Sequence, residues 1–227
     1  MILYAIPAAL GGPAADALPD SSIRIVRSLR DFAVENAKSA RGFLGGLGLA
    51  VRDLNIVVID SDVLSLLRPL REGRSLGLLS EAGCPAIADP GAALVEAAHR
   101  EGFRVVPLVG PSSITLALMA SGLEGQRFAF CGYLPRDKAE REARIRELEK
   151  RSRKENETEI FIETPYRNDA MMNSLLSTCS SSSLLCVAAD LTLPTESIIT
   201  RNVQQWRRAG AVVGRRPAVF LLLADAR

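Results

Sequence analysis

Short apolar runs alternate with helix-like stretches through the first half of this chain, and this alternation limits its fold more than any other feature. The runs lie at residues 2–6, 31–35, 55–60, 75–80 and 103–109. They are nearly continuously apolar, as buried parallel strands are. The pattern therefore predicts a doubly wound, mainly parallel sheet with helices between its strands.

The sequence changes character between residues 125 and 137. A strand is expected at 127–135, and Pro135 with the charged run after it is typical of a linker. Further strands are expected at 157–165, 183–193, 196–200 and 217–225, with helices at 61–73, 167–179 and 202–210. For the helix at 61–73, Ser61 or Asp62 is the expected N-cap. The fold class is thus α/β, with two α/β domains at residues 1–125 and 126–227.

Composition excludes several classes of protein. The 227 residues are 48% hydrophobic, yet no apolar run approaches the roughly 18 residues that span a bilayer. The start of the chain has no basic segment typical of a secretory signal, so we expect a cytoplasmic protein. The four cysteines lie far apart without a C-x-x-C pair, and we expect no metal site. A formal charge of +2 does not by itself predict a nucleic-acid partner.

Three loops combine glycine and proline with small residues. They are "PAALGGPAAD" at 7–16, "SEAGCPAIADPG" at 80–91 and "VGPSSITLALMASGL" at 109–123. The second is about twice as long as a strand-to-helix connection needs to be. Small residues let backbone groups approach a ligand closely. None of the loops is a dinucleotide fingerprint or a phosphate-binding P-loop, so together they indicate a different binding site.

The loop sequences carry a resemblance to a known family. "LLSEAGCPAIADPGAALVEAA", "VVPLVGPSSITLALMASGL", "FCGYLPR" and "FIETPYRN" are similar to segments of the tetrapyrrole methylase family of S-adenosylmethionine-dependent methyltransferases. The resemblance is strongest to the branch that 2′-O-methylates a cytidine of small-subunit ribosomal RNA. It is dense over residues 75–167. It implies a tetrapyrrole methylase-like fold of two α/β domains with the cofactor cleft between them, and a homodimer.

The resemblance also implies a set of binding residues. The cofactor S-adenosyl-L-methionine would be bound largely through backbone groups of residues from four segments: Glu81, Ala82, Gly83, Ile87 and Ala88; Ser113, Ile114 and Thr115; Tyr133 and Leu134; Pro217 and Ala218. Arg136 and Arg167 are the expected substrate-binding residues. We further expect valine at Gly83 or Gly110 to abolish cofactor binding without unfolding the chain.

The chemistry needs few side chains, because a sulfonium methyl group is already activated and transfer depends chiefly on positioning. Glu35, Lys38 and Glu163 are candidates for a general base, and the sequence does not rank them. The branch's "AEDTR" and "RELTK" stretches read "VENAK" at 34–38 and "ADLTL" at 189–193 here, with charged groups lost.

These departures leave several functions open. The first is methyl transfer to a ribose 2′-hydroxyl of ribosomal RNA. The others are methylation of a tetrapyrrole or another small molecule, and a non-catalytic regulatory protein that binds S-adenosylmethionine on the same scaffold. A dehydrogenase is disfavoured because the glycine fingerprint is missing.

Overall fold

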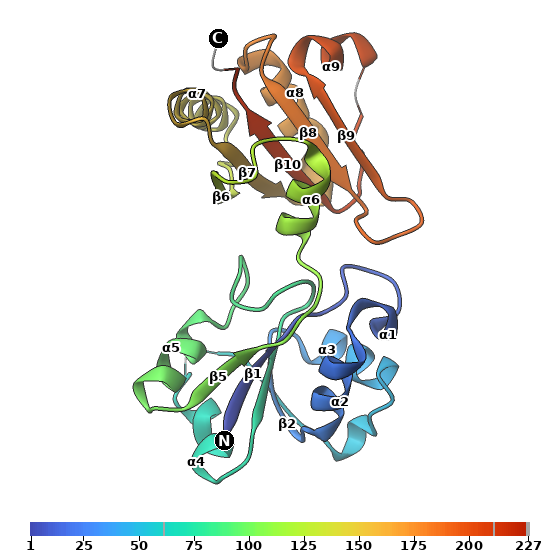
Figure 1. The fold of residues 1–227 in the computed structure, drawn as a ribbon, viewed down its shortest axis with the longest axis vertical. Coiled ribbons are helices and arrows are strands. Elements are labelled where there is room, and N and C mark those ends of the chain that lie inside the picture. The colour runs from blue at the N-terminus through green and yellow to red at the C-terminus, as the bar shows by residue number, and fades with distance from the viewer. Residues whose placement is uncertain (61, 211, 226–227) are drawn as a thin grey trace. The chain divides into compact units, whose positions relative to one another are not determined.

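The structure is a computed structural model that describes residues 1–60, 62–210 and 212–225, and the chain divides into two compact units (Figure 1). The first unit is Met1–Ser112 and the second is Ser113–Arg227. Both are α/β, which confirms the predicted fold class. The domain boundary after residue 125 stays a prediction; residues 113–125 group with the second unit by their contacts.

The first unit is built on a five-stranded parallel sheet in the order β3-β2-β4-β1-β5. Its strands are β1 (Ile2–Ile6), β2 (Asp31–Val34), β3 (Asn55–Val58), β4 (Leu76–Leu79) and β5 (Arg104–Pro107). Each lies within a run predicted from the sequence. The three central strands are the most buried, as parallel strands covered on both faces must be.

Helices cover both faces of this sheet. One face carries α1 (Ala14–Ala17), α2 (Asp20–Ser28), α3 (Ala37–Gly46) and the 3₁₀ turn η1 (Val51–Asp53). The other carries the 3₁₀ turn η2 (Ser65–Leu67), α4 (Arg68–Arg71) and α5 (Ala92–Arg100). Ile23 and Leu44 pack on the first face, and Leu67 and Leu94 pack on the second. The sheet is therefore doubly wound, as predicted.

The helix predicted over residues 61–73 is wrong in most of its length. The structure has only η2 followed by the four-residue α4. Pro69 explains the break, because it has no N–H to donate to the Ser65 carbonyl and its ring clashes with that carbonyl in an α-helix. Leu64, and not Asp62, occupies the N-cap position of η2, although the Ser65 N–H donates to the Asp62 carboxylate at 3.3 Å. Ser61 lies outside the described residues.

The second unit is built on a mixed five-stranded sheet in the order β6-β7-β10-β8-β9. Its strands are β6 (Phe128–Tyr133), β7 (Thr158–Glu163), β8 (Leu184–Ala189), β9 (Ser197–Asn202) and β10 (Ala218–Leu223). β6 and β7 are parallel, and the other neighbouring pairs are antiparallel.

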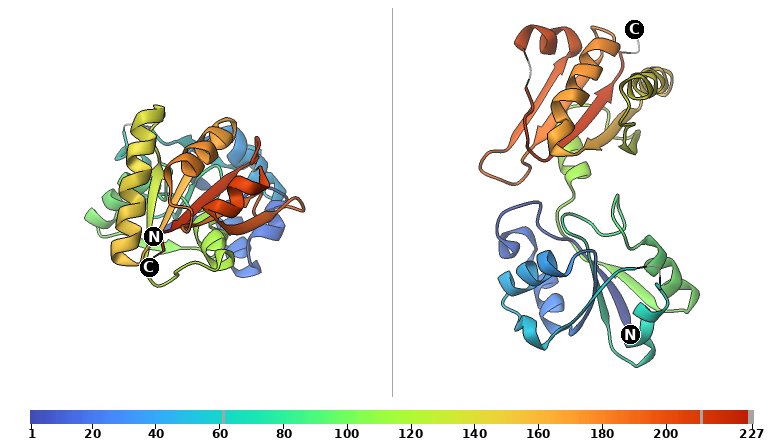
Figure 2. Two further views of the ribbon diagram at one scale, coloured as in Figure 1. Left: turned by 90° about the horizontal axis from the view of Figure 1, so that it is seen from above. Right: turned by 180° about the vertical axis from the view of Figure 1, so that it is seen from behind.

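Helices again cover both faces of the second sheet. The elements are α6 (Ser113–Ser121), α7 (Lys138–Glu155), the 3₁₀ turn η3 (Pro165–Arg167), α8 (Asn168–Thr178) and α9 (Val203–Ala209). α6 lies in front of the sheet in Figure 1, and the orange α8 lies in front of it in the reverse view of Figure 2. In the described residues, no helix is long and apolar enough to cross a membrane.

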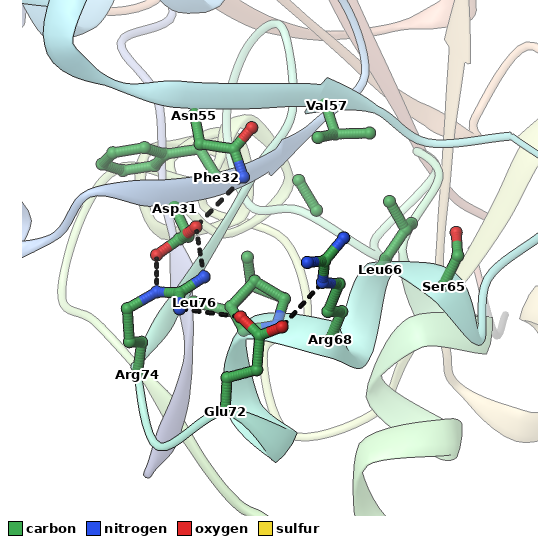
Figure 3. Close-up of a pocket in the computed structure, with 12 residues that line it drawn as sticks. Asp31, Phe32, Asn55, Val57, Ser65, Leu66, Arg68, Glu72, Arg74 and Leu76 are labelled. Atoms are coloured by element: carbon green, nitrogen blue, oxygen red, sulfur yellow. Dashed lines mark hydrogen bonds and ion pairs between the residues drawn. The ribbon is translucent and has the colours of Figure 1, made fainter.

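A pocket of about 440 Å³ opens on the first unit beside β2 and β3 (Figure 3). The buried Asp31 accepts from the Arg74 guanidinium at 2.9 Å and from the Asn55 amide at 3.0 Å. Glu72 bridges Arg74 to Arg68. The hydrogen bond from Arg74 holds the pKa of Asp31 below its ordinary value. Asp31 and Asn55 begin their strands, so this network lies at the amino ends of the sheet and joins strands rather than loops.

We predict that Asp31→Asn lowers the free energy of unfolding by about 1–2 kcal/mol at pH 7, the loss typical of a charge-assisted hydrogen bond. Because the pKa is lowered in the folded state, the contribution is present above the unfolded pKa and is lost as the pH falls through the folded pKa. In urea titrations the difference should shrink as the pH falls below 3.8, the ordinary value of the Asp pKa, and it should vanish below the folded pKa. Glu72→Gln, which is more exposed, should change stability less; an equal loss there would contradict this account.

Candidate functional site

The first candidate site lies at the carboxyl ends of two neighbouring strands whose following loops lead to opposite faces of the sheet. β1 and β4 are paired, with Ile6 opposite Leu79 at their carboxyl ends. The loop after β1 leads to helices on one face, and the loop after β4 leads to α5 on the other. Open α/β sheets bind their ligands at such a switch point.

Hydrogen bonds from neighbouring loops hold the long loop 80–91 at this switch point. Ala8 and Gly83 exchange two backbone bonds, at 2.8 and 3.1 Å. The Glu81 N–H donates to the Glu35 carboxylate at 2.9 Å. The Cys84 thiol donates to the Pro111 carbonyl at 3.5 Å. The loop is therefore an ordered surface that four strand ends support, which explains a length greater than a simple turn needs.

Backbone strain is concentrated in two loops. Of the non-glycine residues with positive φ in the described chain, Ala86 (66°) and Ala88 (63°) lie in loop 80–91, and Asp190 (53°) and Thr192 (71°) lie in the loop after β8. Asn156 is the remaining one and ends α7. Such conformations cost energy and cluster at binding sites. Both loops are therefore candidates for ligand contact on conformational grounds.

Three carboxylates gather at loop 80–91. Glu35 follows β2, Glu81 is the second residue of the loop and accepts from the Ser39 hydroxyl at 3.2 Å, and Asp89 lies near the loop's end. Partial burial, followed by repulsion from Glu35 and then from Glu81, raises the pKa of Asp89 to about 6. The group favours a proton or another cation beside it.

In the second unit, the predicted site residues gather at one end of the sheet. Strand register aligns Glu163, Ala218, Ala189 and Ser197 in one row across β7, β10, β8 and β9. Tyr133 lies opposite Ile162, one residue from that row. Positions from five separate segments of the sequence thus lie at a single sheet end.

The residues at this end of the sheet differ in how far their side chains are exposed to solvent. Tyr133 is 59% exposed, whereas the Leu134 side chain is buried in the core, so Leu134 can offer a ligand only its backbone. Arg136 is exposed. Arg167 is mostly buried and pairs with the buried Glu163. The Pro217 carbonyl accepts from the Asp190 N–H at 3.0 Å, and Ala218 starts β10.

Other predicted residues fall on both units. Glu81, Ala82, Gly83, Ile87 and Ala88 belong to the first, with Ile87 49% exposed. The second unit begins with Ser113, Ile114 and Thr115, which form the first turn of α6. Of the candidate bases, Glu35 and Glu163 are engaged in the bonds described above, and Lys38 is exposed in the first turn of α3.

Sequence reasoning missed Arg141, a buried arginine behind the segment that carries Tyr133 to Arg136. Its guanidinium donates to the Arg136 carbonyl at 2.9 Å and to the Ser174 hydroxyl at 3.0 Å. It forms no ion pair within the part of the chain that the structure describes. Its spacing from Ile145 and Leu148 places it on the buried stripe of α7, a signal that was readable in the charged run.

The structure corrects the expectation for Gly110. A Cβ at that position would lie 2.5 Å from Cβ of Pro7 and 2.7 Å from Leu18. Valine there must displace the β1 loop, so it disturbs the fold and does not test binding alone. Gly83 has more space, its Cβ lying 3.4 Å from Leu10, but its φ of +70° disfavours any side chain.

With these features in place, comparison with known proteins identifies the class. A family model described as Tetrapyrrole (Corrin/Porphyrin) Methylases matches residues 58–206, more than half of the chain. The chain belongs to the tetrapyrrole methylase family and is a methyltransferase. This confirms the resemblance seen in the loop sequences.

Relatives named Ribosomal RNA small subunit methyltransferase I match over much of the chain. The one from Halalkalibacterium halodurans is 30% identical over 221 residues, which are 93% of this chain and 73% of that protein. The one from Xylella fastidiosa is 34% identical, covering 77% of this chain and 63% of its own length. The Thermotoga maritima relative is also 34% identical, covering 70% and 72%.

Solved structures share the fold at lower identity. Diphthine synthase matches with a TM-score of 0.68 and 16% identity, covering 99% of this chain and 90% of that one. The methyltransferase CobJ matches with a TM-score of 0.64 and 17% identity, covering 99% and 94%. At these identities the likeness supports the fold alone.

We predict that Asp89→Asn stabilises the protein at pH 7.5 and leaves it unchanged at pH 4. A pKa raised from 3.8 to about 6 means that the folded state holds the proton more tightly than the unfolded chain. The stabilisation of the folded state by this bound proton is complete below about pH 4 and is lost as the pH rises through 6. The gain should be below about 1 kcal/mol because water screens the half-exposed carboxyl.

Urea titrations across this range measure the effect of Asp89→Asn. Glu35→Gln removes the stronger of the two repulsions on Asp89. The pH at which the stability changes should then move toward the ordinary carboxyl pKa. A variant that is destabilised equally at both pH values would show that Asp89 is a structural acceptor instead.

Proposed function

We propose that this chain is a cytoplasmic, S-adenosylmethionine-dependent methyltransferase that methylates a ribose 2′-hydroxyl of small-subunit ribosomal RNA. The observation that carries the proposal is the similarity, at 30–34% identity over 70–93% of the chain, to relatives named for that RNA. The ordered loops at the switch point of the first sheet support it. A homodimer, as the resemblance implies, is part of the same proposal.

The residues of loop 80–91 fit a cationic cofactor. Ala82 and Ala88 are exposed and carry no bulk beyond a methyl group, so a ligand could reach their backbone. The pKa of Asp89 is raised first by burial and then by the charges of Glu35 and Glu81, and a nearby sulfonium or ammonium group would stabilise its carboxylate. These properties favour S-adenosylmethionine over an anionic dinucleotide.

The chain's own contribution to the reaction would be positioning. S-adenosylmethionine supplies an activated methyl group when bound, so the protein must hold the acceptor oxygen in line with it. Glu35, Lys38 and Glu163 remain the candidates to accept the hydroxyl proton. Glu163 is the most constrained of the three, because Arg167 and the Thr164 N–H both bind its carboxylate.

A second candidate function is a regulatory protein that binds S-adenosylmethionine without transferring its methyl group. The "VENAK" and "ADLTL" segments, which lack charged residues that the branch carries, favour it. A tetrapyrrole or other small-molecule acceptor is the third, and it has only the family and fold in its support.

We predict that S-adenosylmethionine binds the wild-type protein in calorimetry and that Ile87→Ala weakens binding severalfold. Ile87 is 49% exposed in the loop, and a ligand that covers it would bury apolar surface. Val57→Ala is the matched control, because Val57 is 41% exposed on β3 away from the loop. Equal effects of the two substitutions would contradict the assigned site.

Methyl transfer separates the candidate functions. Labelled S-adenosylmethionine should methylate small ribosomal subunits from a strain that lacks this protein, and ribose mapping should place the label on a 2′-oxygen. Binding with no labelled RNA would contradict the RNA enzyme and favour the regulatory protein. Label on an added tetrapyrrole would favour the third candidate.

A further inference from the structure

An exposed tyrosine is held on a rigid segment at the end of the second sheet. Tyr166 is the middle residue of η3 and is 69% exposed. Pro165 fixes φ at the start of the turn, and the Arg167 N–H donates to the Thr164 carbonyl at 2.9 Å. The buried ion pair between Glu163 and Arg167 joins the last residue of the turn to the end of β7. The backbone is therefore fixed while the ring faces solvent.

The start of α8 binds the loop before β10 to this turn. The buried Asn168 donates from its amide to the Gly214 carbonyl at 2.9 Å and to the Arg216 carbonyl at 2.7 Å. Asp169 accepts from the Val213 and Gly214 N–H groups. Arg215, which lies between two of the bonded residues, is exposed and is therefore held close to the segment that carries Tyr166.

The chain segment that carries Arg215 is basic. Residues 197–224 contain five arginines and no Asp or Glu, although Asp169 of α8 binds the backbone of this segment. Three of the arginines have structural partners. Arg201 lies over the Trp206 ring at 5.2 Å, Arg207 donates to the carbonyls of Leu176 and Cys179 at the end of α8, and Arg216 pairs with Asp190 at 3.6 Å. Arg215 forms no ion pair among residues 1–60, 62–210 and 212–225. Its charge is available to a partner.

The exposed Tyr166 ring and the Arg215 guanidinium lie on segments that are joined by hydrogen bonds, and this combination of groups matches single-stranded RNA. Unpaired bases stack on aromatic side chains, and arginines bind the phosphates that flank them. A protein partner could also cover a tyrosine and an arginine. An acid-free stretch of 28 residues favours a polyanion instead, because it offers no negative charge to the basic groups of a mixed protein surface.

We propose that Tyr166 is a stacking platform for an unpaired nucleobase and that Arg215 contacts an adjacent phosphate. This inference rests on the proposed function, since it names the surface that would bind the RNA substrate. It adds a site that the cofactor loops do not include. Tyr166 acts by position and takes no part in bond making.

The test is binding of a fluorescein-labelled, unstructured 12-nucleotide RNA, followed by anisotropy with S-adenosylhomocysteine present. Tyr166→Ala should weaken binding roughly tenfold, and Tyr166→Phe, which keeps the ring, should stay within about twofold. Arg215→Ala should reduce the slope of log affinity against log salt by about 0.7, the value for one single-strand phosphate. Arg30→Ala, an exposed arginine at the start of β2, is the control and should change neither quantity.

The outcomes distinguish this inference from the proposed function. If the wild type methylates RNA but Tyr166→Ala leaves both affinity and KM for RNA unchanged, the platform is wrong and the function stands. If Tyr166→Phe loses as much as Tyr166→Ala, the hydroxyl and not stacking is responsible, and the platform is again wrong. A wild type that neither binds nor methylates RNA contradicts both. Unchanged thermal melting of Tyr166→Ala excludes misfolding as the cause of a loss.

Discussion

The paired backbone bonds between Ala8 and Gly83 are the constraint on which the loops at the carboxyl end of the first sheet depend. They join the loops of β1 and β4 at the point where those loops depart toward opposite faces of the sheet. Without this link, loop 80–91 would be a long glycine- and proline-rich connection with high entropy. With it, and with Glu35 and Cys84 bonding the loop to the ends of β2 and β5, the strained Ala86 and Ala88 are held in place.

The two units differ in the charges that surround their candidate sites. In the first, partial burial and then repulsion from Glu35 and Glu81 raise the pKa of Asp89, which suits a cationic ligand. In the second, Glu163 and Asp190 are paired with Arg167 and Arg216, and Asp169 accepts from backbone N–H groups of the loop before β10. These acids are therefore engaged, which leaves the charge of Arg215 for the phosphate contact that we propose. The pocket at Asp31 has neither property, since its charges neutralise one another within the network.

Much of the fold was predictable, because buried parallel strands leave continuous apolar runs and the five runs of the first half all became strands. The family was readable for a related reason: loops that bind through backbone keep glycine and proline at fixed places. The failures are equally physical. Pro69 broke an otherwise helical pattern, and the contact of Gly110 with Pro7 joins residues far apart in sequence. The positive φ of Ala86 could not be predicted, since alanine, unlike glycine, has no preference for that conformation. Arg141 lies in the charged run that we expected to be a linker; the run forms α7 instead, and the register of this helix places Arg141 inside.

The central claim is that the main chain of loop 80–91 forms the cofactor surface. Amide hydrogen exchange with and without S-adenosylmethionine tests it most directly, because exchange reports the backbone itself. The account predicts slower exchange at residues 82–88 when the compound is added, with β2 amides beside the Asp31 pocket unchanged. Unchanged exchange throughout the loop, at concentrations where calorimetry shows binding, would contradict it.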